Sequence, residues 1–178
     1  MHKDIQEVLI EDAVVQMKVK ELADKISKDY QGKDLLFVCI LKGSFIFCSD
    51  LSRKMSIPVA MDFMAVSSYR DSAVSSGAVM IIKDLDSNIA GKHVLIIEDI
   101  VDTGLTLKYL LENLKARRPL SVEVCTLLDK PERRKVDVDV KYNGFKVPDV
   151  FIVGYGLDYQ ERYRQLPDVC VLKPEIYL

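Results

Sequence analysis

A segment of nine residues, 98–106, gathers three carboxylates, two threonines and a glycine. A glycine allows close backbone approach or a positive φ, and backbone amides with threonine hydroxyls at a helix start can hold a phosphate. Carboxylates so close to a phosphate would repel it unless they bind something else, such as sugar hydroxyls or Mg²⁺. The segment therefore favours binding of a phosphorylated sugar. The alternative is that Glu98, Asp99 and Asp102 are ordinary acids of a helix start, where acids are common.

Other phosphate-binding and metal-binding patterns find little support in the sequence. It contains no G-x-x-x-x-G-K-[ST] motif, and the Gly-Tyr-Gly of residues 154–156 stops short of G-x-G-x-x-G. The cysteines form no C-x-x-C pair and only two histidines could join them, which argues against a zinc or iron–sulfur site. We expect small buried thiols at Cys39, Cys48, Cys125 and Cys170.

The elements around the segment are predicted from their apolar patterns. Residues 94–97 form an apolar strand before it, and leucines at helical spacing predict a helix over 107–117 after it. Residues 35–41 are too apolar for a half-exposed strand, which indicates a parallel sheet covered on both faces. Ligands bind beyond the carboxyl ends of the strands in such sheets. Further strands are predicted at 59–66, 79–82, 122–128 and 150–153, helices at 12–30 and 45–54, and a long mobile loop at 67–77.

Composition narrows the class of protein. A chain of 178 residues with 49% hydrophobic and 29% charged residues has the make-up of one globular domain. A formal charge of −2 offers no broad electrostatic footprint for nucleic acid. The longest apolar run, residues 35–41, is far shorter than the roughly 18 residues of a membrane-spanning helix. The acidic N-terminal residues are unlike a signal peptide, so we expect a cytoplasmic protein.

Residues 94–106, Val-Leu-Ile-Ile-Glu-Asp-Ile-Val-Asp-Thr-Gly-Leu-Thr, resemble the phosphoribosyl-diphosphate signature of the type I phosphoribosyltransferases. Further matches follow in order along almost the whole chain, and they are similar to the bacterial members that act on 6-oxopurines. The matching segments are Leu41-Lys42-Gly43, Ser68-Tyr69, Leu127-Leu128-Asp129-Lys130 and residues 150–159, with Arg164 beyond them. One residue departs from the pattern, because Arg70 stands where many relatives have glycine.

The resemblance implies a fold and a reaction. The fold is a single-domain α/β type I phosphoribosyltransferase fold over residues 1–178, with a mainly parallel sheet flanked by helices, a small hood region and a mobile loop. The reaction would transfer the 5-phosphoribosyl group from its diphosphate donor to N9 of hypoxanthine or guanine. It gives IMP or GMP plus pyrophosphate, in purine salvage. The resemblance also implies a requirement for Mg²⁺ and a homodimer or homotetramer. The charge and the short apolar runs predict no nucleic-acid or membrane partner.

The resemblance assigns the segment to the sugar, its phosphate and the proton transfer. Glu98 and Asp99 would hold the ribose 2- and 3-hydroxyls directly or through Mg²⁺, for which hard carboxylate oxygens suit. Asp102 would face purine N7, where proton transfer requires a carboxylate within hydrogen-bond reach. The 5-phosphate would be held by Thr103, Gly104, Leu105 and Thr106.

The pyrophosphate would be held by residues outside the segment. Lys42 and Gly43 would contact it, and in this family an unusual cis peptide bond precedes that lysine. Arg164 would be a second contact, since a guanidinium can hold phosphate oxygens at two points. Asp158 would bind a second Mg²⁺ on the pyrophosphate. Without the resemblance, Lys42-Gly43 is a plain strand-ending turn, and Arg164 and Asp158 are ordinary surface charges.

The purine would be recognised by three residues. An ammonium has donors only, so Lys130 can satisfy a purine 6-oxygen but would meet the 6-amino group of adenine donor to donor. Phe151 would stack on the purine, and Ile152 would offer backbone groups to its edge. Without the resemblance, Lys130 is a solvated turn residue of a basic stretch, and Phe151 and Ile152 are core residues.

A lid and two rival functions complete the sequence-based expectations. Ser68 and Tyr69 would close over the site and exclude water, which protects a reactive sugar cation. One rival is a non-catalytic regulator that keeps the fold to sense phosphoribosyl diphosphate. The other is phosphoryl transfer through an aspartyl phosphate on Asp99 or Asp102.

Overall fold

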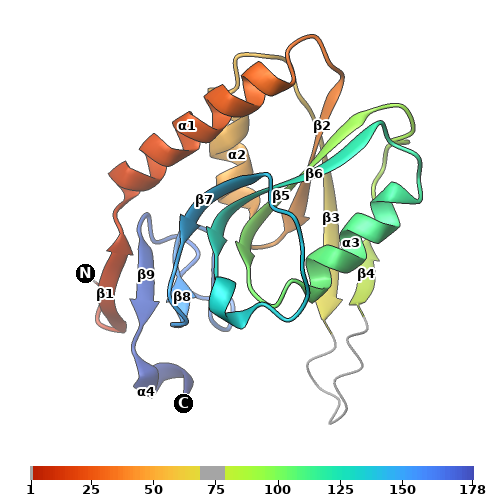
Figure 1. The fold of residues 1–178 in the computed structure, drawn as a ribbon. Coiled ribbons are helices and arrows are strands. Elements are labelled where there is room, and N and C mark those ends of the chain that lie inside the picture. Colours follow the sequence, from red (N-terminus) through yellow and green to blue (C-terminus); the bar gives the residue numbers. More distant parts are fainter. Residues whose placement is uncertain (1, 69–78) are drawn as a thin grey trace.

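The protein is described by a computed structural model that covers residues 2–68 and 79–178. Two sheets and their covering helices make up the fold (Figure 1). In chain order the elements are β1 (Ile5–Ile10), α1 (Asp12–Asp29), β2 (Leu35–Leu41), α2 (Phe45–Lys54), β3 (Ala60–Ser68), β4 (Val79–Lys83), β5 (His93–Val101), α3 (Leu105–Lys115), β6 (Ser121–Asp129), the 3₁₀ turn η1 (Pro131–Arg133), β7 (Tyr142–Lys146), β8 (Ile152–Val153), β9 (Val169–Leu172) and α4 (Pro174–Tyr177).

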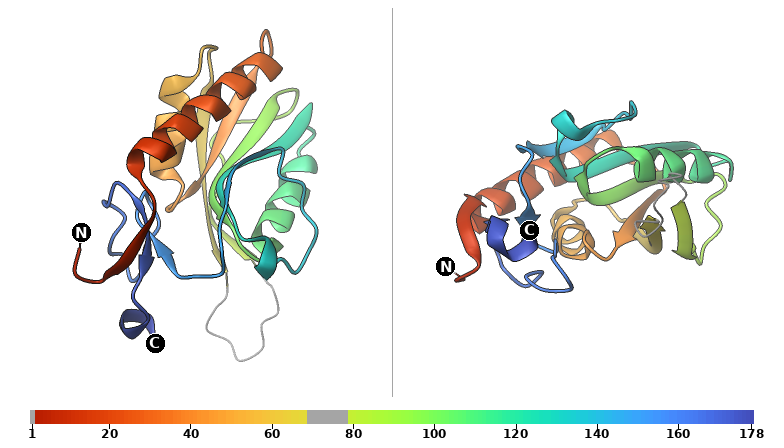
Figure 2. Two further views of the ribbon diagram at one scale, coloured as in Figure 1. Left: turned by 60° about the vertical axis from the view of Figure 1, so that its left-hand side comes forward. Right: turned by 90° about the horizontal axis from the view of Figure 1, so that it is seen from below.

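The larger sheet has the strand order β4-β3-β2-β5-β6-β7. Strands β3, β2, β5, β6 and β7 run parallel to one another, and β4 pairs antiparallel with β3 at one edge. Helices α1 and α2 cover one face and α3 covers the other, as the end-on view of Figure 2 shows. The predicted mainly parallel sheet flanked by helices is confirmed.

Alternation along β2 shows why this strand is apolar throughout. Phe37 and Cys39 pack with the core under α1 and α2, whereas Leu36, Val38 and Ile40 pack with the core under α3. A strand buried on both faces has no solvent side on which a polar residue could stand. The predicted limits of β2 and α2 agree with the structure.

The smaller sheet, the hood sheet, has the antiparallel order β1-β9-β8. The predicted strand 150–153 is observed as β8, and it lies in this hood sheet. β1, β7 and β9 were not predicted from the sequence. β1 is largely exposed after Ile5, and the Tyr-Asn-Gly start of β7 reads as a turn. Only pairing with the buried strands β9 and β6 makes these segments strands.

Two boundaries near the predicted site differ from the sequence-based expectation. β5 continues to Val101, so Glu98 and Asp99 are strand residues and the interpretation of these two as helix-start acids is wrong. Ser67 and Ser68 were expected in the loop 67–77, but their backbone belongs to β3 and pairs with β4. The rest of that predicted loop, with Tyr69, lies outside the described residues. Backbone pairing with an adjacent strand explains both extensions.

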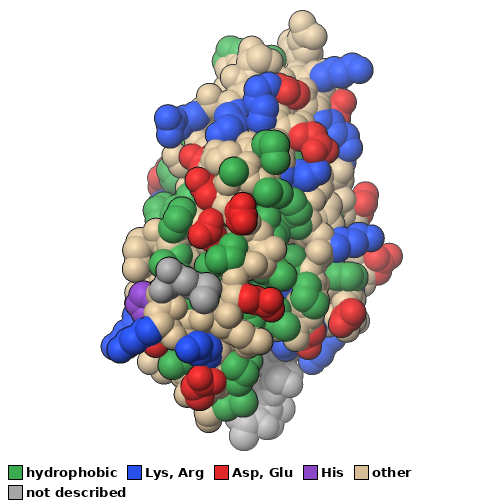
Figure 3. All heavy atoms as spheres, turned by 90° about the vertical axis from the view of Figure 1, so that its left-hand side faces the viewer, with side chains coloured by type: hydrophobic (Ala, Val, Ile, Leu, Met, Phe, Trp, Pro, Cys, Tyr) green, Lys and Arg blue, Asp and Glu red, His purple; other side chains and the backbone are tan. Residues whose placement is uncertain are grey.

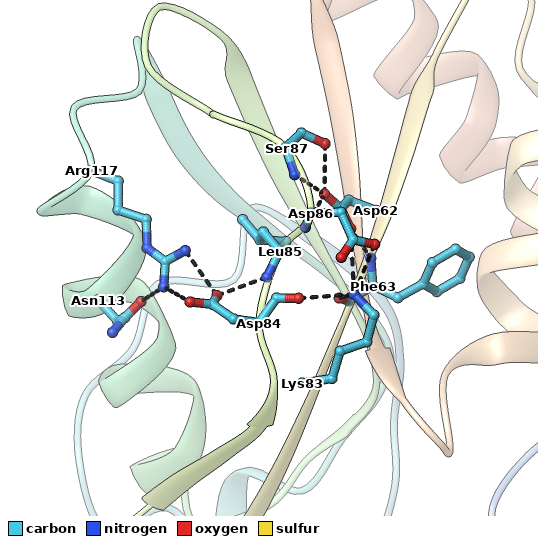
Figure 4. A network of polar contacts seen from close by, with 9 residues as sticks. All are labelled: Asp62, Phe63, Lys83, Asp84, Leu85, Asp86, Ser87, Asn113 and Arg117. Atoms are coloured by element: carbon cyan, nitrogen blue, oxygen red, sulfur yellow. Dashed lines mark hydrogen bonds and ion pairs between the residues drawn. The ribbon is translucent and has the colours of Figure 1, made fainter.

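A buried carboxylate fixes the connection between β4 and β5. Asp62, only 3% exposed, accepts hydrogen bonds from the amides of Asp86 and Ser87 and from the Ser87 hydroxyl (Figure 4). Next to it, Asp84 pairs with Arg117 at the end of α3 (Figure 4). These contacts hold the β4 edge of the large sheet.

Surface charge and membrane features agree with the composition. Acidic and basic side chains are interspersed on the face shown in Figure 3. Among the described residues, no helix is long and apolar enough to cross a membrane. All four cysteines are free and buried, as predicted.

Candidate active site

Three strand ends bring the predicted site residues to one edge of the large sheet. β2 ends before Lys42 and Gly43, β5 ends before Asp102, and β6 ends at Asp129, directly before Lys130. These strands are parallel neighbours, so their carboxyl ends meet at the same edge. The hood sheet lies beside this edge (Figure 1).

Two adjacent carboxyl groups lie at the end of β5. Glu98 is 9% exposed, and burial together with the neighbouring Asp99 raises its pKa well above the usual range. Burial also raises the pKa of Asp99 to about 6, although the Ile100 amide and the Arg164 guanidinium oppose this shift. Both shifts have the same origin, because removing a carboxylate from water penalises its charged form.

Gly43 gives this carboxyl pair its contact with the loop after β2. A Cβ at Gly43 would lie 1.6 Å from Asp99 Oδ2, so any larger residue would displace this carboxylate. The loop after β8 approaches the same backbone at Gly156, where a Cβ would lie 2.2 Å from the Gly43 carbonyl oxygen. Two glycines therefore allow the β2 loop, the β5 carboxylate and the loop after β8 to meet.

The carboxyl pair fits a magnesium ion. Within the described ranges no cluster of three or more His, Cys, Asp or Glu side chains could hold a metal alone. Mg²⁺ is usually held by one or two carboxylates together with substrate oxygens and water. A divalent cation would also favour the charged forms of Glu98 and Asp99, which burial disfavours. The residues present are therefore compatible with a magnesium ion whose coordination a substrate would complete.

Lys42 and Arg164 converge from two loops onto one carboxylate. A cis peptide bond joins Leu41 to Lys42, as the resemblance implied. The Lys42 Nζ atom lies 3.2 Å from Glu161 Oε1, and Arg164 Nη2 lies 3.3 Å from the same oxygen. Arg164 also pairs with Asp158 at 2.9 Å. The ion pair with Lys42 lowers the pKa of Glu161. The two cations expected to hold pyrophosphate are therefore close enough to share one anion.

The start of α3 has the geometry of an anion site. Gly104, at φ +83°, is the N-cap, and its carbonyl accepts the first helical hydrogen bond from Lys108 at 2.9 Å. The first-turn amides of a helix have no partner within the helix and carry partial positive charge. The residue before this N-cap is also held, because the Lys135 amide donates to the Thr103 carbonyl at 2.9 Å. The residues expected to hold the 5-phosphate, Thr103, Gly104, Leu105 and Thr106, form this turn.

Lys130 is buried, and this excludes its interpretation as a solvated turn residue. It is 7% exposed, and its Nζ donates to the Val150 carbonyl at 2.6 Å and lies 3.7 Å from Asp149 Oδ1. Burial lowers its pKa, while the charges of Asp102 and Asp149 act in the opposite direction. Among the described residues, the Lys130 ammonium thus has one hydrogen-bond acceptor, Val150, and one nearby carboxylate, Asp149.

Phe151 and Ile152 lie next to Lys130, because Val150 accepts its hydrogen bond. Ile152 is buried in β8. The Phe151 ring stacks on Tyr177 with centroids 4.7 Å apart and meets Tyr159 edge-on at 5.4 Å. Folding thus brings the C-terminal helix α4 against the residue expected to stack on the purine.

Several residues at this edge were missed from the sequence: Arg133, Asp149, Glu161 and Tyr177. Arg133 lies in a basic stretch expected to be solvated, and no local pattern distinguishes it. Glu161 follows Asp158 in a turn where Gln160, Glu161 and Tyr163 all have positive φ, which the sequence does not signal. Of the expected lid, Ser68 ends β3 at the same edge of the sheet, and Tyr69 lies outside the described residues.

A family model described as the phosphoribosyl transferase domain matches residues 9–160. The chain belongs to the phosphoribosyltransferase family. This membership confirms the predicted fold and the enzyme class, a glycosyltransferase.

Individual relatives of this phosphoribosyltransferase agree along its whole length. The hypoxanthine-guanine phosphoribosyltransferase of Staphylococcus aureus (strain Mu50) is 54% identical over 177 residues, 99% of both chains. A crystal structure of a hypoxanthine phosphoribosyltransferase from Staphylococcus aureus has a TM-score of 0.96 at 54% identity and covers 100% of this chain and 97% of that one. A hypoxanthine phosphoribosyltransferase structure from Trypanosoma cruzi has a TM-score of 0.94 at 41% identity, covering 99% and 96%.

Proposed function

We propose that this phosphoribosyltransferase transfers the 5-phosphoribosyl group from its diphosphate donor to N9 of hypoxanthine or guanine. Its Staphylococcus aureus relative is named a hypoxanthine-guanine phosphoribosyltransferase. The products are IMP or GMP and pyrophosphate. The observation that carries the proposal is the buried Lys130, whose backbone amide donates to the carbonyl of Val101, the residue before Asp102, at the carboxyl ends of β5 and β6. The pair combines a donor for a 6-oxopurine with a carboxylate that can exchange a proton with it.

The hydrogen-bond donors of Lys130 favour a 6-oxopurine over adenine as the base. The Lys130 ammonium has three N–H donors, of which one is used by the Val150 carbonyl and one faces Asp149. The third is available to the 6-oxygen of hypoxanthine or guanine. Adenine would place its own amino donor there and leave both groups unpaired, which can separate substrates by roughly 10⁴-fold or more.

The bond changes assign roles to the other residues. The C1–O bond to the diphosphate breaks, the C1–N9 bond forms, and the purine gives up a proton, for which Asp102 would serve at N7. Lys42 and Arg164 would bind the departing pyrophosphate after Glu161 moves from them. The turn at 103–106 would hold the 5-phosphate in place. Positioning of this kind lowers the barrier by fixing the reactants in a reactive geometry.

The residues that would hold Mg²⁺ are the carboxylates on the donor side. Glu98 and Asp99 would bind one ion with the ribose hydroxyls, and Asp158 would bind a second at the pyrophosphate. The chemistry that bound Mg²⁺ supplies is neutralisation of charge on the diphosphate. Asp158 now pairs with Arg164 and accepts a hydrogen bond from the Glu161 amide, so ligand binding would rearrange this group.

Self-association as a homodimer or homotetramer is part of the proposal. Exposed apolar side chains lie on the edge strand β4 and on its neighbour β3, at Met61, Phe63, Met80 and Ile82. Contiguous exposed apolar surface marks sites of protein contact. Light scattering would test this, and a mass of 20.2 kDa in solution, that of one chain, would contradict it.

A reducing compartment, and hence the cytoplasm, is the proposed location. All four cysteines are free thiols with no disulfide between them. Persistent free thiols are typical of compartments that glutathione and thioredoxin keep reduced. Fractionation of cells that make the protein would test the location.

A base-conversion assay tests the function. The protein is incubated with Mg²⁺, phosphoribosyl diphosphate and hypoxanthine, guanine, xanthine or adenine, and the nucleotide formed is measured. We expect conversion of hypoxanthine and guanine and none of adenine. Efficient use of adenine would overturn the assignment of Lys130. Binding of the donor without any conversion would favour the sensing regulator, and an acid-labile phosphoprotein would favour aspartyl phosphate chemistry.

A further inference from the structure

Arg133 lies between two acids, Asp102 and Asp149, that are close to Lys130 in the fold. Its Nε atom is 2.9 Å from Asp102 Oδ1, and its Nη1 atom is 3.4 Å from Asp149 Oδ1. Asp102 Oδ1 is shielded from solvent and makes no hydrogen bond within the described part of the chain. The guanidinium is therefore the charge that compensates this oxygen.

The same network reaches Lys130. Asp149 Oδ1, which pairs with Arg133, also lies 3.7 Å from Lys130 Nζ. The order of charges is Asp102, Arg133, Asp149, Lys130, with alternating sign. The two ends are the residues proposed to meet purine N7 and the purine 6-oxygen. One arginine thus connects the proton-transfer group to the group that recognises the base.

The backbone that carries Arg133 is anchored on both sides. The Arg133 amide donates to the Lys130 carbonyl at 3.2 Å, which closes the turn η1. Two residues later, the Lys135 amide donates to the Thr103 carbonyl in the loop that contains Asp102. Arg134 forms an ion pair with Asp129 at the end of β6. The turn is thereby fixed to both strand ends that it bridges.

We propose that Arg133 is a positioning residue of the base site, which acts on turnover by holding Asp102 through Oδ1. This inference rests on the proposed function. An exposed ion pair with no role at the site would contribute little to stability and nothing to turnover. A shift of about 1 Å in a reacting group, in contrast, can cost on the order of 10²-fold in rate.

The test compares Arg133→Gln and Arg133→Lys with a matched control, Arg117→Gln. Arg117 also pairs with an aspartate, Asp84 at 2.8 Å, but lies at the far end of α3. For Arg133→Gln we expect kcat with hypoxanthine to fall about 10- to 100-fold, with donor KM changed less than about threefold. Added guanidinium should restore part of the activity. Arg133→Lys should lie between wild type and Arg133→Gln, and the control should keep the wild-type kcat.

A double-mutant cycle with Asp102→Asn separates positioning from a structural role. If Arg133 acts through Asp102, then Arg133→Gln should have little further effect on kcat once Asp102 is replaced. Melting temperatures of all variants show whether they fold. If Arg133→Gln does not fold, Arg133→Lys takes its place in the cycle. If the wild type is active but Arg133→Gln keeps the wild-type kcat, this inference alone is overturned. It is also overturned if the effects of the two substitutions on kcat multiply in the double mutant. A wild type that converts no base would instead overturn the proposed function.

Discussion

Replacing Gly43 with alanine tests the contact between the β2 loop and the β5 carboxylate. The added Cβ would lie 1.6 Å from Asp99 Oδ2, whereas ordinary contact begins at 3.4 Å, so the carboxylate must move by about 1.8 Å. The backbone at Gly43 lies outside the left-handed region, so alanine brings no φ strain there. The effect of Gly43→Ala therefore comes from displacement of Asp99.

The size of the effect follows from two contacts of Asp99. Displacement of a substrate-positioning group by about 1 Å can cost on the order of 10²-fold, which corresponds to about 2.7 kcal/mol of transition-state stabilisation. Asp99 Oδ1 also accepts the Ile100 amide at 2.7 Å, and loss of this bond costs about 1 kcal/mol of folding free energy. We expect kcat/KM for the donor to fall about 100-fold, and the melting temperature to fall by about 2 to 4 °C.

The assay varies phosphoribosyl diphosphate and Mg²⁺ at saturating hypoxanthine and records melting curves in parallel. Gly32→Ala is the control, because Gly32 has a φ of +73° but open space around its Cβ position. It should lower the melting temperature without changing kinetics. A Gly43→Ala enzyme with wild-type donor kinetics would refute the proposed role of Asp99 in donor binding.

Two further predictions concern charges at the donor site and in the core. Replacing Glu161 with Gln should lower donor KM by less than about tenfold, since it frees Lys42 and Arg164 from a pair that pyrophosphate must displace; a raised KM would contradict this. Replacing Asp62 with Ala should destabilise the protein by about 2 kcal/mol at pH 7, with the exposed Asp86→Ala as control, because it removes the buried carboxylate that accepts hydrogen bonds from the Asp86 and Ser87 amides and the Ser87 hydroxyl. Burial tends to raise the pKa of Asp62, but its hydrogen bonds outweigh burial and leave it lowered. This stability is therefore present above about pH 4 and lost as the pH falls below it, so equal unfolding free-energy differences at pH 7 and pH 3 would refute the argument.

Local sequence determined the core elements and the place of the site. Strand β2 and helix α2 were predicted with their observed limits, because each has a strong apolar pattern followed by a clear break. The segment 98–106 was predicted at the carboxyl edge of a parallel sheet, and it lies there. The roles of its residues came from the resemblance and remain predictions. Apolar periodicity is a local property, which is why the sequence alone reveals it.

Tertiary structure decided the hood sheet and the charge network. β1 and β9 pair although they lie near opposite ends of the chain, and nothing local predicts such pairing. Lys130 is buried because β8 and the loop before it pack against the end of β6, so its ammonium acquires partners that its own segment lacks. Arg133 gains its role in the same way. Burial and pairing of a charge depend on which distant segments fold over it, and only the folded chain brings those segments together.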